Sequence, residues 1–297
     1  MERKKIHPNG PTFSRLVTGA WRWNSLSPDL TKKLIDTSID AGITTFDHAD
    51  IYGDYSCEKL FGHALTGRSS LRKNLQLISK CGIKLLSEKK PDHRINHYDT
   101  SKEHIIRSAE TSLKNLHTDF LDLLLIHRPD PLLNPEEVAE AFTALKQSGK
   151  VLYFGVSNFT SAQFDMLQTL VQVPLVTNQI EISLFYNDLL YDGTIDTAMK
   201  FRASPMAWSP LGGGKFFTEP GSYEGARLQL GLLSEKYGCT VTQLLLAWIL
   251  SHPSGMFPIL GSTNPERIKE GAESLAVKLE KQDWFILLKS IVGKDVP

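Results

Sequence analysis

Leu123-Leu124-Leu125-Ile126 is a run of four apolar residues that stops at the polar pair His127-Arg128. A short, uninterrupted apolar run is typical of a strand that is covered on both of its faces, as in a parallel sheet. Amphipathic helical patterns lie on both sides of the run. The stretch therefore predicts a buried strand between two helices.

The same alternation of strand and helix continues from Leu16 to Ala276. Each predicted strand is a short β-rich segment that ends in polar residues, and several are continuous apolar runs. The predicted strands are Leu16–Ala20, Thr44–Asp47, Leu75–Lys80, Leu121–His127, Tyr153–Ser157, Leu175–Ile180, Pro205–Trp208 and Phe257–Leu260. Strands that alternate with helices in this way predict an α/β protein with a parallel sheet.

Helix start and stop signals support the alternation. Thr100-Ser101-Lys102-Glu103 fits a capping box, in which a hydroxyl and a carboxylate satisfy the first backbone amides of a helix. Asn134-Pro135 and Asn264-Pro265 each place an N-cap residue before a proline at the first helical position. Gly149 is a stop signal for the helix that Asn134 opens.

Two architectures fit this pattern, a (β/α)₈ TIM barrel and a doubly wound open sheet. The chain of 297 residues is close to the ~250 residues typical of the barrel. The open sheet usually carries a G-x-G-x-x-G turn after its first strand, and this chain has none there. No linker or low-complexity stretch interrupts the chain, so we predict one TIM-barrel domain over residues 1–297.

Composition and charge narrow the class of protein. Thirty-three basic and thirty-three acidic side chains cancel, so no overall field attracts nucleic acid or an anionic membrane surface. The most apolar run, Leu244 to Leu250, is too short to span a bilayer, and the first ten residues lack the apolar core of a signal peptide. We expect a cytoplasmic protein that binds a small molecule, with no nucleic acid and no membrane as partners.

Cysteine and histidine usage gives no sign of a metal. Cys57, Cys81 and Cys239 are scattered and odd in number, which is typical of free thiols in a reducing compartment. His93 and His97 lie near two acids in the polar loop 85–99, where a solvated loop is a simpler reading than a site. We predict no metal.

Barrel enzymes carry their chemistry at the carboxyl ends of the strands, so polar residues at those positions are the candidates. They are Trp21, Trp23, Asp47, Tyr52, Lys80, His127, Ser157, Asn158, Gln179, Trp208, Ser209 and Gly261 to Thr263. Taken singly, each has a structural reading: Asp47 as an N-cap, Tyr52 as a packed loop residue, Lys80 as a solvated charge and His127 as a structural histidine. Their placement at successive strand ends favours a shared site.

The chain resembles the aldo-keto reductases, in their bacterial general oxidoreductase branch, along nearly its whole length. Phe46-Asp47-His48-Ala49-Asp50-Ile51-Tyr52-Gly53 is similar to the family's second-strand signature. Lys80 in Ile78-Ser79-Lys80 and His127 in Leu123–Asp130 are similar to its third- and fourth-strand residues. The resemblance implies a (β/α)₈ barrel and NADPH-dependent reduction of an aldehyde or ketone to an alcohol.

The resemblance also implies roles for the catalytic candidates. Tyr52 supplies a proton to the carbonyl oxygen, and the ammonium of Lys80 lowers the tyrosine pKa from its usual ~10. Asp47 holds Lys80 through a salt bridge, and a neutral His127 orients the substrate oxygen. Trp21 and Trp23, after the first strand, are expected to form walls of the substrate pocket.

Four segments, Gly155–Phe159, Asn178-Gln179, Trp208–Gly212 and Pro258–Ser262, are similar to the family's cofactor-binding segments and appear in the same order. Ser157, Asn158 and Gln179 are expected to hold the nicotinamide carboxamide, and Trp208 to stack on the ring. The glycine-rich loop after Trp208 lets backbone approach a pyrophosphate. The expected cofactor contacts in the loops are Ser209, Leu211, Gly212, Gly261, Ser262, Thr263 and Arg267.

Two departures from the family pattern matter. Many members carry a lysine-serine pair where this chain has Ile259-Leu260, so NADPH over NADH rests on Ser262, Thr263 and Arg267 at a helix start. His48 stands where many relatives have threonine. It either perturbs the Asp47–Lys80 pair or points into a packing layer.

Two other functions stay open at this point. One is a cofactor-binding regulatory module with little turnover, as in the channel-associated relatives of the family. The other is a barrel lyase or isomerase in which Lys80 forms a Schiff base.

Overall fold

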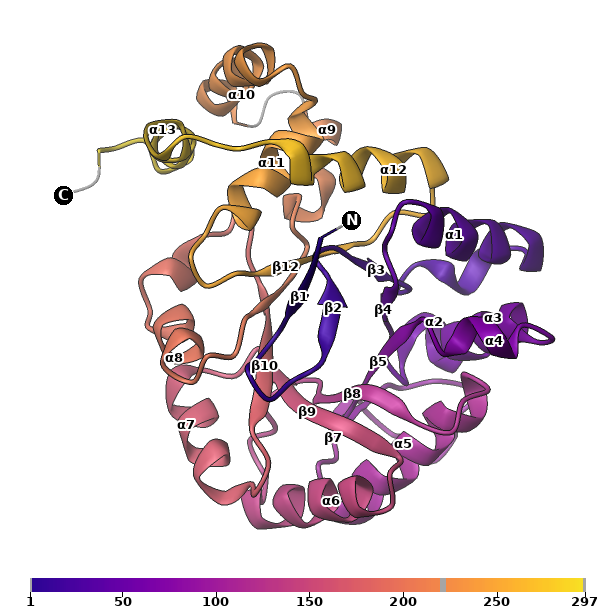
Figure 1. The fold of residues 1–297 in the computed structure, drawn as a ribbon. Coiled ribbons are helices and arrows are strands. Elements are labelled where there is room, and N and C mark those ends of the chain that lie inside the picture. Colours follow the sequence, from indigo (N-terminus) through magenta and orange to yellow (C-terminus); the bar gives the residue numbers. More distant parts are fainter. Residues whose placement is uncertain (1, 220–222, 296–297) are drawn as a thin grey trace.

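Eight parallel strands close on themselves into a barrel, and helices cover its outside (Figure 1). This computed structural model describes residues 2–219 and 223–295; the remaining positions of the predicted domain, 1, 220–222 and 296–297, lie outside the described residues. The strands follow one another around the barrel in chain order, and the last pairs with the first. The predicted TIM-barrel fold is therefore confirmed.

All eight predicted strands are barrel strands, and their ends agree with the prediction within two residues. They are β3 (Val17–Gly19), β4 (Thr45–Asp47), β5 (Gln76–Cys81), β8 (Leu121–Ile126), β9 (Val151–Ser157), β10 (Leu175–Glu181), β11 (Met206–Trp208) and β12 (Phe257–Leu260). Every residue of β5 and β8 is buried. Burial on both faces explains why β8 contains the continuous apolar run Leu123–Ile126, which does not alternate with polar residues.

The helices lie mainly between successive strands and around the barrel. They are α1 (Pro28–Asp40), α2 (Tyr52–Tyr55), α3 (Cys57–Leu65), α4 (Ser69–Arg72), α5 (Lys102–Asn115), α6 (Pro135–Gln147), α7 (Ser161–Leu170), α8 (Thr194–Lys200), α9 (Lys215–Thr218), α10 (Glu224–Tyr237), α11 (Val241–Leu250), α12 (Pro265–Glu273) and α13 (Lys281–Val292). Short 3₁₀ turns are η1 (Trp23–Ser25), η2 (Asp188–Leu190), η3 (Gly212–Gly214) and η4 (Ser274–Ala276).

The helix caps agree with the sequence signals in two of three cases. Asn134 and Asn264 cap α6 and α12, each with a proline at the first helical position. The capping box at Thr100 is wrong by one residue: Ser101 is the N-cap of α5 and accepts a hydrogen bond from the amide of His104. Ser101 also donates to Asp99, which fixes its hydroxyl in place.

An N-terminal hairpin that the sequence analysis did not predict covers one end of the barrel. Its strands are β1 (Arg3–Lys5) and β2 (Thr12–Ser14), and Figure 1 shows them across the barrel centre. Ile6 and Phe13 pack into the apolar cluster that fills the barrel interior. Ser14 hydrogen-bonds the start of β4, so the hairpin lies at the amino-terminal ends of the strands.

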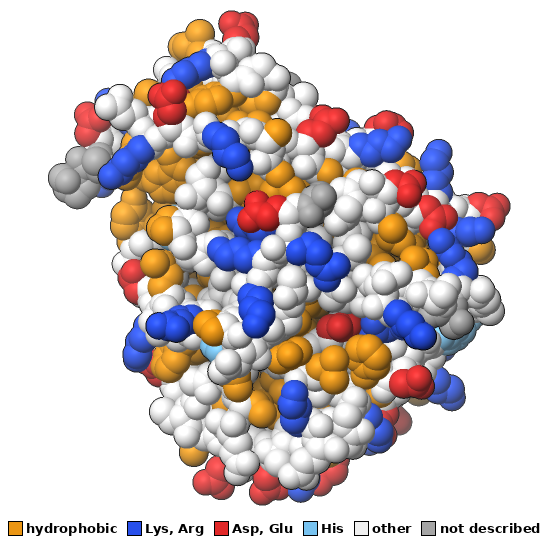
Figure 2. Space-filling view, in the orientation of Figure 1, with side chains coloured by type: hydrophobic (Ala, Val, Ile, Leu, Met, Phe, Trp, Pro, Cys, Tyr) orange, Lys and Arg blue, Asp and Glu red, His pale blue; other side chains and the backbone are white. Residues whose placement is uncertain are grey.

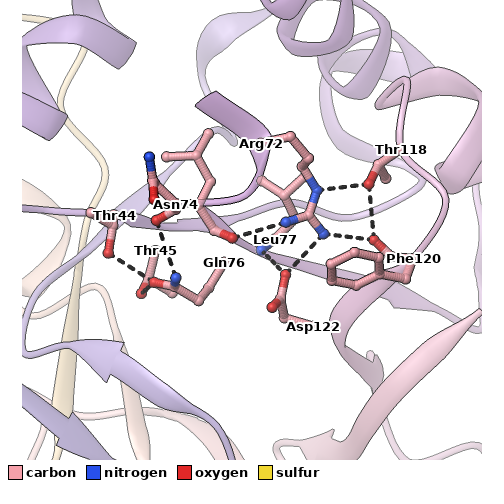
Figure 3. Close-up of polar contacts among 10 residues, drawn as sticks. Thr44, Thr45, Arg72, Asn74, Gln76, Leu77, Thr118, Phe120 and Asp122 are labelled. Carbon is pink, nitrogen blue, oxygen red and sulfur yellow. Dashed lines mark hydrogen bonds and ion pairs between the residues drawn. The ribbon is translucent and has the colours of Figure 1, made fainter. Parts of the chain in front are cut away.

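An arginine network fixes the same end of two neighbouring strands (Figure 3). Arg72 donates to the backbone oxygen of Phe120 and to the carboxylate of Asp122, at 2.8 and 3.0 Å. Asp122 in turn accepts from the amide of Leu77 on β5, at 2.8 Å. The network sets β5 against β8, and therefore sets which residues of these strands reach the opposite end.

The surface carries both signs of charge. Figure 2 shows basic and acidic side chains mixed over the face that Figure 1 presents. No helix in the described part of the chain has the length and apolar character needed to cross a bilayer. A second small hairpin, β6 (Ile83–Lys84) with β7 (His97–Tyr98), closes the base of the polar loop 85–99.

Candidate active site

A cavity of about 950 Å³ opens at the carboxyl-terminal ends of the barrel strands. Its lining comes from strand ends and from the loops that follow them, as expected for this architecture. The lining residues include Asp47, Tyr52, His127, Trp208 and Arg267. These five predicted site residues, from the ends of β4, β8 and β11 and from α12, therefore share one cavity.

Asp47, Lys80 and Tyr52 form a hydrogen-bonded chain that leads from the barrel interior to the cavity. The Lys80 ammonium donates to Asp47 Oδ2 at 2.7 Å, to Tyr52 Oη at 2.9 Å and to the backbone oxygen of His48 at 2.8 Å. Its side chain is 0% exposed and does not line the cavity. All three ammonium protons thus have partners, and the amine reaches the cavity only through the Tyr52 hydroxyl.

A left-handed turn holds Tyr52 at the cavity wall. Gly53, Asp54 and Tyr55 have φ angles of 58°, 53° and 62° in succession. A Cβ on Gly53 would meet Asn24 at 2.4 Å and Cys57 at 2.5 Å, so only glycine fits there. The turn closes because Ser56 donates to the Gly53 oxygen at 2.5 Å. Left-handed non-glycine residues store strain, which is common beside functional groups.

The protonation states of Lys80 and Tyr52 differ from the sequence-based expectation in one respect. Burial lowers the pKa of Lys80, but Asp47 and Tyr52 raise it, and the net result is a raised pKa and a charged ammonium. Burial raises the pKa of Tyr52, and although Lys80 lowers it, burial outweighs the ammonium. Lys80 therefore acts on the Tyr52 pKa in the expected direction, but burial makes the net shift upward. Tyr52 is a protonated phenol at neutral pH.

His127 lies beside Tyr52 and is uncharged. Their ring centroids are 5.7 Å apart in an edge-on arrangement. Burial lowers the pKa of His127 well below its usual value, and the charges of Lys80 and Arg128 lower it further. The backbone amide of His127 donates to Cys81 at the end of β5, which holds the residue next to the Lys80 strand.

Polar side chains at the ends of β9, β10 and β11 form a second network. Trp208 Nε1 donates to the Asn158 side chain at 3.0 Å, and Asn158 donates to Ser157 at 2.7 Å. Ser157 donates to the backbone oxygen of Gln179, whose amide donates to Asp47 Oδ1 at 2.9 Å. The network therefore connects the indole of Trp208 with the acid that holds Lys80.

The far side of the cavity has open backbone and an unpaired cation. A Cβ added to Gly213, Gly214 or Gly261 would meet nothing within 4 Å. Arg267 and Ser262 line the cavity near the start of α12, and Arg267 has no ion pair within the described residues. These are features that suit a phosphate.

Three predicted contacts do not line the cavity. Thr263 lies next to lining residues but not among them, and Gly212 faces the ring of Phe185, which a Cβ would meet at 2.8 Å. Trp23 is 0% exposed and packs against Phe61, with ring centroids 5.9 Å apart. The placement of Trp23 at the substrate pocket is wrong, because η1 turns its side chain into the core. Trp21 does line the cavity and is 56% exposed.

His48 belongs to the packing layer. Its ring meets Phe61 edge-on, with centroids 4.5 Å apart, and both ring nitrogens are buried without hydrogen-bond partners among the described residues. Burial lowers the pKa of His48 to about 3, and Lys80 lowers it further, so the ring is neutral. Only its backbone oxygen takes part in the site, as an acceptor for Lys80.

Asp50 is enclosed close to the site but faces away from it. Ser108 on α5 donates to Asp50 Oδ2 at 2.7 Å, whereas Oδ1 is buried and has no partner among the described residues. Burial raises the pKa of Asp50 to about 7, more than the Ser108 hydrogen bond lowers it. Asp50 is therefore protonated over part of the pH range in which ordinary carboxyls are charged.

This raised pKa predicts a stability effect. Between the unfolded pKa of 3.8 and about 7, the folded state binds more protons than the unfolded state, so stability falls as pH rises. Asp50→Asn should remove this loss, and its stability relative to wild type should rise from pH 5 to pH 7 by up to about 1.4 kcal/mol per pH unit. Urea unfolding at several pH values measures it, with Asp92→Asn on the exposed loop as the control. A difference that is constant with pH would contradict the raised pKa.

Some cavity residues escaped the sequence analysis. They are Arg22, Asp54, Thr242 and Glu270, among others. Arg22 lies in the loop after β3, so its position after a strand end was a signal that could have identified it. Within residues 2–219 and 223–295, no group of three or more His, Cys, Asp or Glu side chains is placed so that it could hold a metal ion.

Comparison with known proteins shows the family to which the chain belongs. A sequence model described as "Aldo/keto reductase family" matches residues 15–291. The chain is 50% identical to a Bacillus subtilis protein named "Uncharacterized oxidoreductase YcsN", over 96% of each chain. It is 43% identical to an Agrobacterium fabrum protein named "6-dehydroglucose reductase", again over 96% of each.

A solved structure agrees with the fold. The thermostable aldo-keto reductase Tm1743, in complex with the inhibitor epalrestat, superposes with a TM-score of 0.84 at 26% identity. The match covers 98% of this chain and 100% of the other. The likeness therefore extends over the barrel and the loops that build the cavity.

Proposed function

The chain belongs to the aldo/keto reductase family and is an oxidoreductase, and from that premise we propose that it reduces an aldehyde or ketone to an alcohol with NADPH, with Tyr52 as the proton donor. One observation carries the proposal. The buried ammonium of Lys80, anchored by Asp47, donates a hydrogen bond to the Tyr52 hydroxyl, and Tyr52 lines the cavity.

Reduction of a carbonyl group needs a hydride and a proton, and this chain supplies the proton. NADPH, when bound, supplies the hydride for the carbonyl carbon. Tyr52 supplies the proton for the carbonyl oxygen, since its raised pKa keeps it protonated at neutral pH. Lys80 stabilises the phenolate that remains, because its ammonium already lies 2.9 Å from Tyr52 Oη. Asp47 keeps that ammonium charged in a buried place.

His127 is proposed to orient the substrate oxygen. A neutral imidazole can donate one hydrogen bond without adding a charge, and its ring lies edge-on to Tyr52. Two donors directed at one oxygen stabilise the negative charge that develops there in the transition state. The substrate carbonyl is thereby held beside the Tyr52 hydroxyl.

The residues present fit a nicotinamide dinucleotide. Trp208 offers a ring whose indole nitrogen is already held by Asn158. Asn158 and Ser209 adopt left-handed φ angles of 58° and 50°, which turn the chain sharply after β9 and β11. Gly213, Gly214 and Gly261 leave backbone open to approach. We propose that these segments hold the cofactor, with Ser157, Asn158 and Gln179 nearest its reacting ring.

Arg267 is the proposed source of NADPH preference. It is exposed, it lines the cavity, and its guanidinium suits a phosphate. Arg267→Ala should weaken NADPH binding by about 10–100-fold, as expected for loss of a hydrogen bond to a charged group, and should weaken NADH binding less. Fluorescence titration with both cofactors measures this, with Arg107→Ala on the exposed face of α5 as the control. Equal wild-type affinity for the two cofactors would remove the preference.

A panel of aldehydes and ketones, followed by loss of NADPH absorbance, tests the proposed function. The panel should include 6-dehydroglucose, because a relative at 43% identity is named for reducing it. Turnover of several carbonyl compounds is the expected result. Tight NADPH binding with no turnover of any of them would favour a cofactor-binding module.

A Schiff-base reaction at Lys80 has little support. The amine is 0% exposed and charged, and its three protons are occupied by Asp47, Tyr52 and the His48 oxygen. A protonated, enclosed amine is a poor nucleophile. Borohydride should therefore trap no substrate on Lys80.

A further inference from the structure

We infer that Arg128 selects carbonyl compounds that carry a second, anionic group, a carboxylate in the simplest case. The inference rests on the proposed carbonyl reduction and names a substrate class for the same cavity. It starts from a cation that the proposed proton transfer does not use.

Arg128 stands where a substrate group next to the carbonyl would lie. It follows His127 in the chain and lines the cavity together with Tyr52 and Trp208. Burial dominates the pKa shifts of Tyr52 and His127, and the charge of Arg128 lowers the pKa of both. The guanidinium is thus within electrostatic reach of the proposed proton donor and of its neighbour.

The guanidinium of Arg128 lies over the Trp208 ring, and its N–H donors have no acceptor among the described residues. Its carbon lies 5.3 Å from the centre of the Trp208 ring. An arginine over an aromatic ring engages that ring with its face, and its N–H groups remain free along the edge. Across residues 2–219 and 223–295, no carboxylate lies within 4.0 Å of Arg128 and no group accepts a hydrogen bond from its side chain. Such a preorganised fork matches a planar carboxylate.

The acids of the cavity are already engaged elsewhere. Asp47 binds Lys80, Asp54 pairs with Lys89 at 3.3 Å, and Glu270 accepts from Thr240 at 2.7 Å. Burial raises the pKa of Glu181, at the end of β10, while Arg128 lowers it, yet the two form no ion pair within 4.0 Å.

A second arginine has the same arrangement. Arg22, in the loop after β3, lies over Trp21 at 5.0 Å and also lines the cavity. Within the described residues it too has no ion-pair partner. Arg22 and Arg128 thus add two cations without ion-pair partners among the described residues to the cavity lining, which favours an anionic compound over a neutral one.

The test compares two aldehydes that differ at one end of the chain, where one has a carboxylate and the other a methyl group. 4-Oxobutanoate and butanal have the same four-carbon chain and the same aldehyde. Wild type should prefer 4-oxobutanoate in kcat/KM by about 10–100-fold, the effect of one or two charge-assisted hydrogen bonds. Arg128→Gln should reduce that ratio by a similar factor, mainly through KM, because an anchor remote from the reacting bond contributes equally to ground and transition states. Arg107→Gln, on α5, should leave the ratio unchanged.

Several outcomes would overturn the inference. One is a wild-type ratio near one, and another is an equal loss for both substrates in Arg128→Gln, which would give Arg128 a general role. Loss of NADPH affinity in Arg128→Gln would assign the residue to the cofactor. A preference for a neutral sugar aldehyde, with the same dependence on Arg128, would make hydroxyls the recognised group.

A binding measurement separates this inference from the proposed function. Calorimetry with the protein and NADP⁺ compares 4-hydroxybutanoate with butan-1-ol, in wild type and in Arg128→Gln. If wild type turns over no carbonyl compound, the reductase proposal fails, yet Arg128-dependent binding of the anion still supports the anionic subsite. Binding that does not depend on Arg128 overturns the subsite, whatever the turnover.

Discussion

Tyr52→Phe should lower kcat for carbonyl reduction by about 10²–10⁴, the range expected for a lost general acid, and should leave the dissociation constant of NADPH unchanged. The substitution removes one oxygen, which accepts from Lys80 and faces the cavity. The ring and the left-handed turn at Gly53 to Tyr55 remain. The reacting carbonyl then lacks a proton source, whereas no proposed cofactor contact is lost.

The measurement needs a matched control and a second readout. Tyr191→Phe removes the hydroxyl of an exposed tyrosine and should not change kcat. NADPH binding, followed by protein fluorescence, shows whether the cavity is intact in both variants. Undiminished turnover by Tyr52→Phe would remove Tyr52 as the proton donor, and another donor such as His127 would have to be considered.

Lys80→Met is expected to have the second largest effect, on activity and on stability together. The ammonium is 0% exposed and is bound by Asp47 at 2.7 Å. Its loss leaves a buried carboxylate without its partner, which costs about 3–5 kcal/mol in comparable cases. The Tyr52 phenolate also loses the cation that stabilises it, so kcat should fall by about 10²–10⁴.

A double variant distinguishes these two effects. Asp47→Asn combined with Lys80→Met removes both charges, so much of the stability should return, while turnover should stay low. Thermal unfolding and kcat, measured on the single and double variants, give the comparison. Recovery of turnover together with stability would mean that Lys80 acts only through folding. In alcohol oxidation, the pH at which Tyr52 becomes a base should rise in the double variant, because Lys80 no longer lowers its pKa.

The barrel strands were predictable because burial on both faces leaves a direct trace in the sequence. In Leu121–Ile126 the run Leu123-Leu124-Leu125-Ile126 is apolar at every position, and it stops at the polar pair His127-Arg128. The N-terminal hairpin left no such trace. Its strands have three residues each, and Arg3–Lys5 is wholly basic. Tertiary contacts at the barrel end determine its conformation, and a local pattern does not report those contacts.

The candidate site was predictable to the extent that it depends on strand ends. Asp47, Tyr52 and His127 reach one cavity because parallel strands of a barrel end on the same side. The predicted position of Trp23 was wrong because the 3₁₀ turn η1, which begins at Trp23, directs its side chain into the core, whereas Trp21 lines the cavity. The net shift of the Tyr52 pKa could not be predicted for another reason. The charge of Lys80 is visible in the sequence, but the depth to which Tyr52 is buried is not.

The hairpin of Arg3–Lys5 and Thr12–Ser14 has a consequence for kinetics. It closes one end of the barrel, and its residues Ile6 and Phe13 pack into the interior. We therefore expect cofactor and carbonyl compound to enter and leave through the cavity at the opposite end of the barrel. Two residues proposed to hold the nicotinamide, Ser157 and Gln179, are only 1% and 2% exposed and line the deep part of that cavity. Because the proposed nicotinamide contacts are buried deepest, we expect an ordered sequence, in which cofactor binds before substrate and product leaves before cofactor.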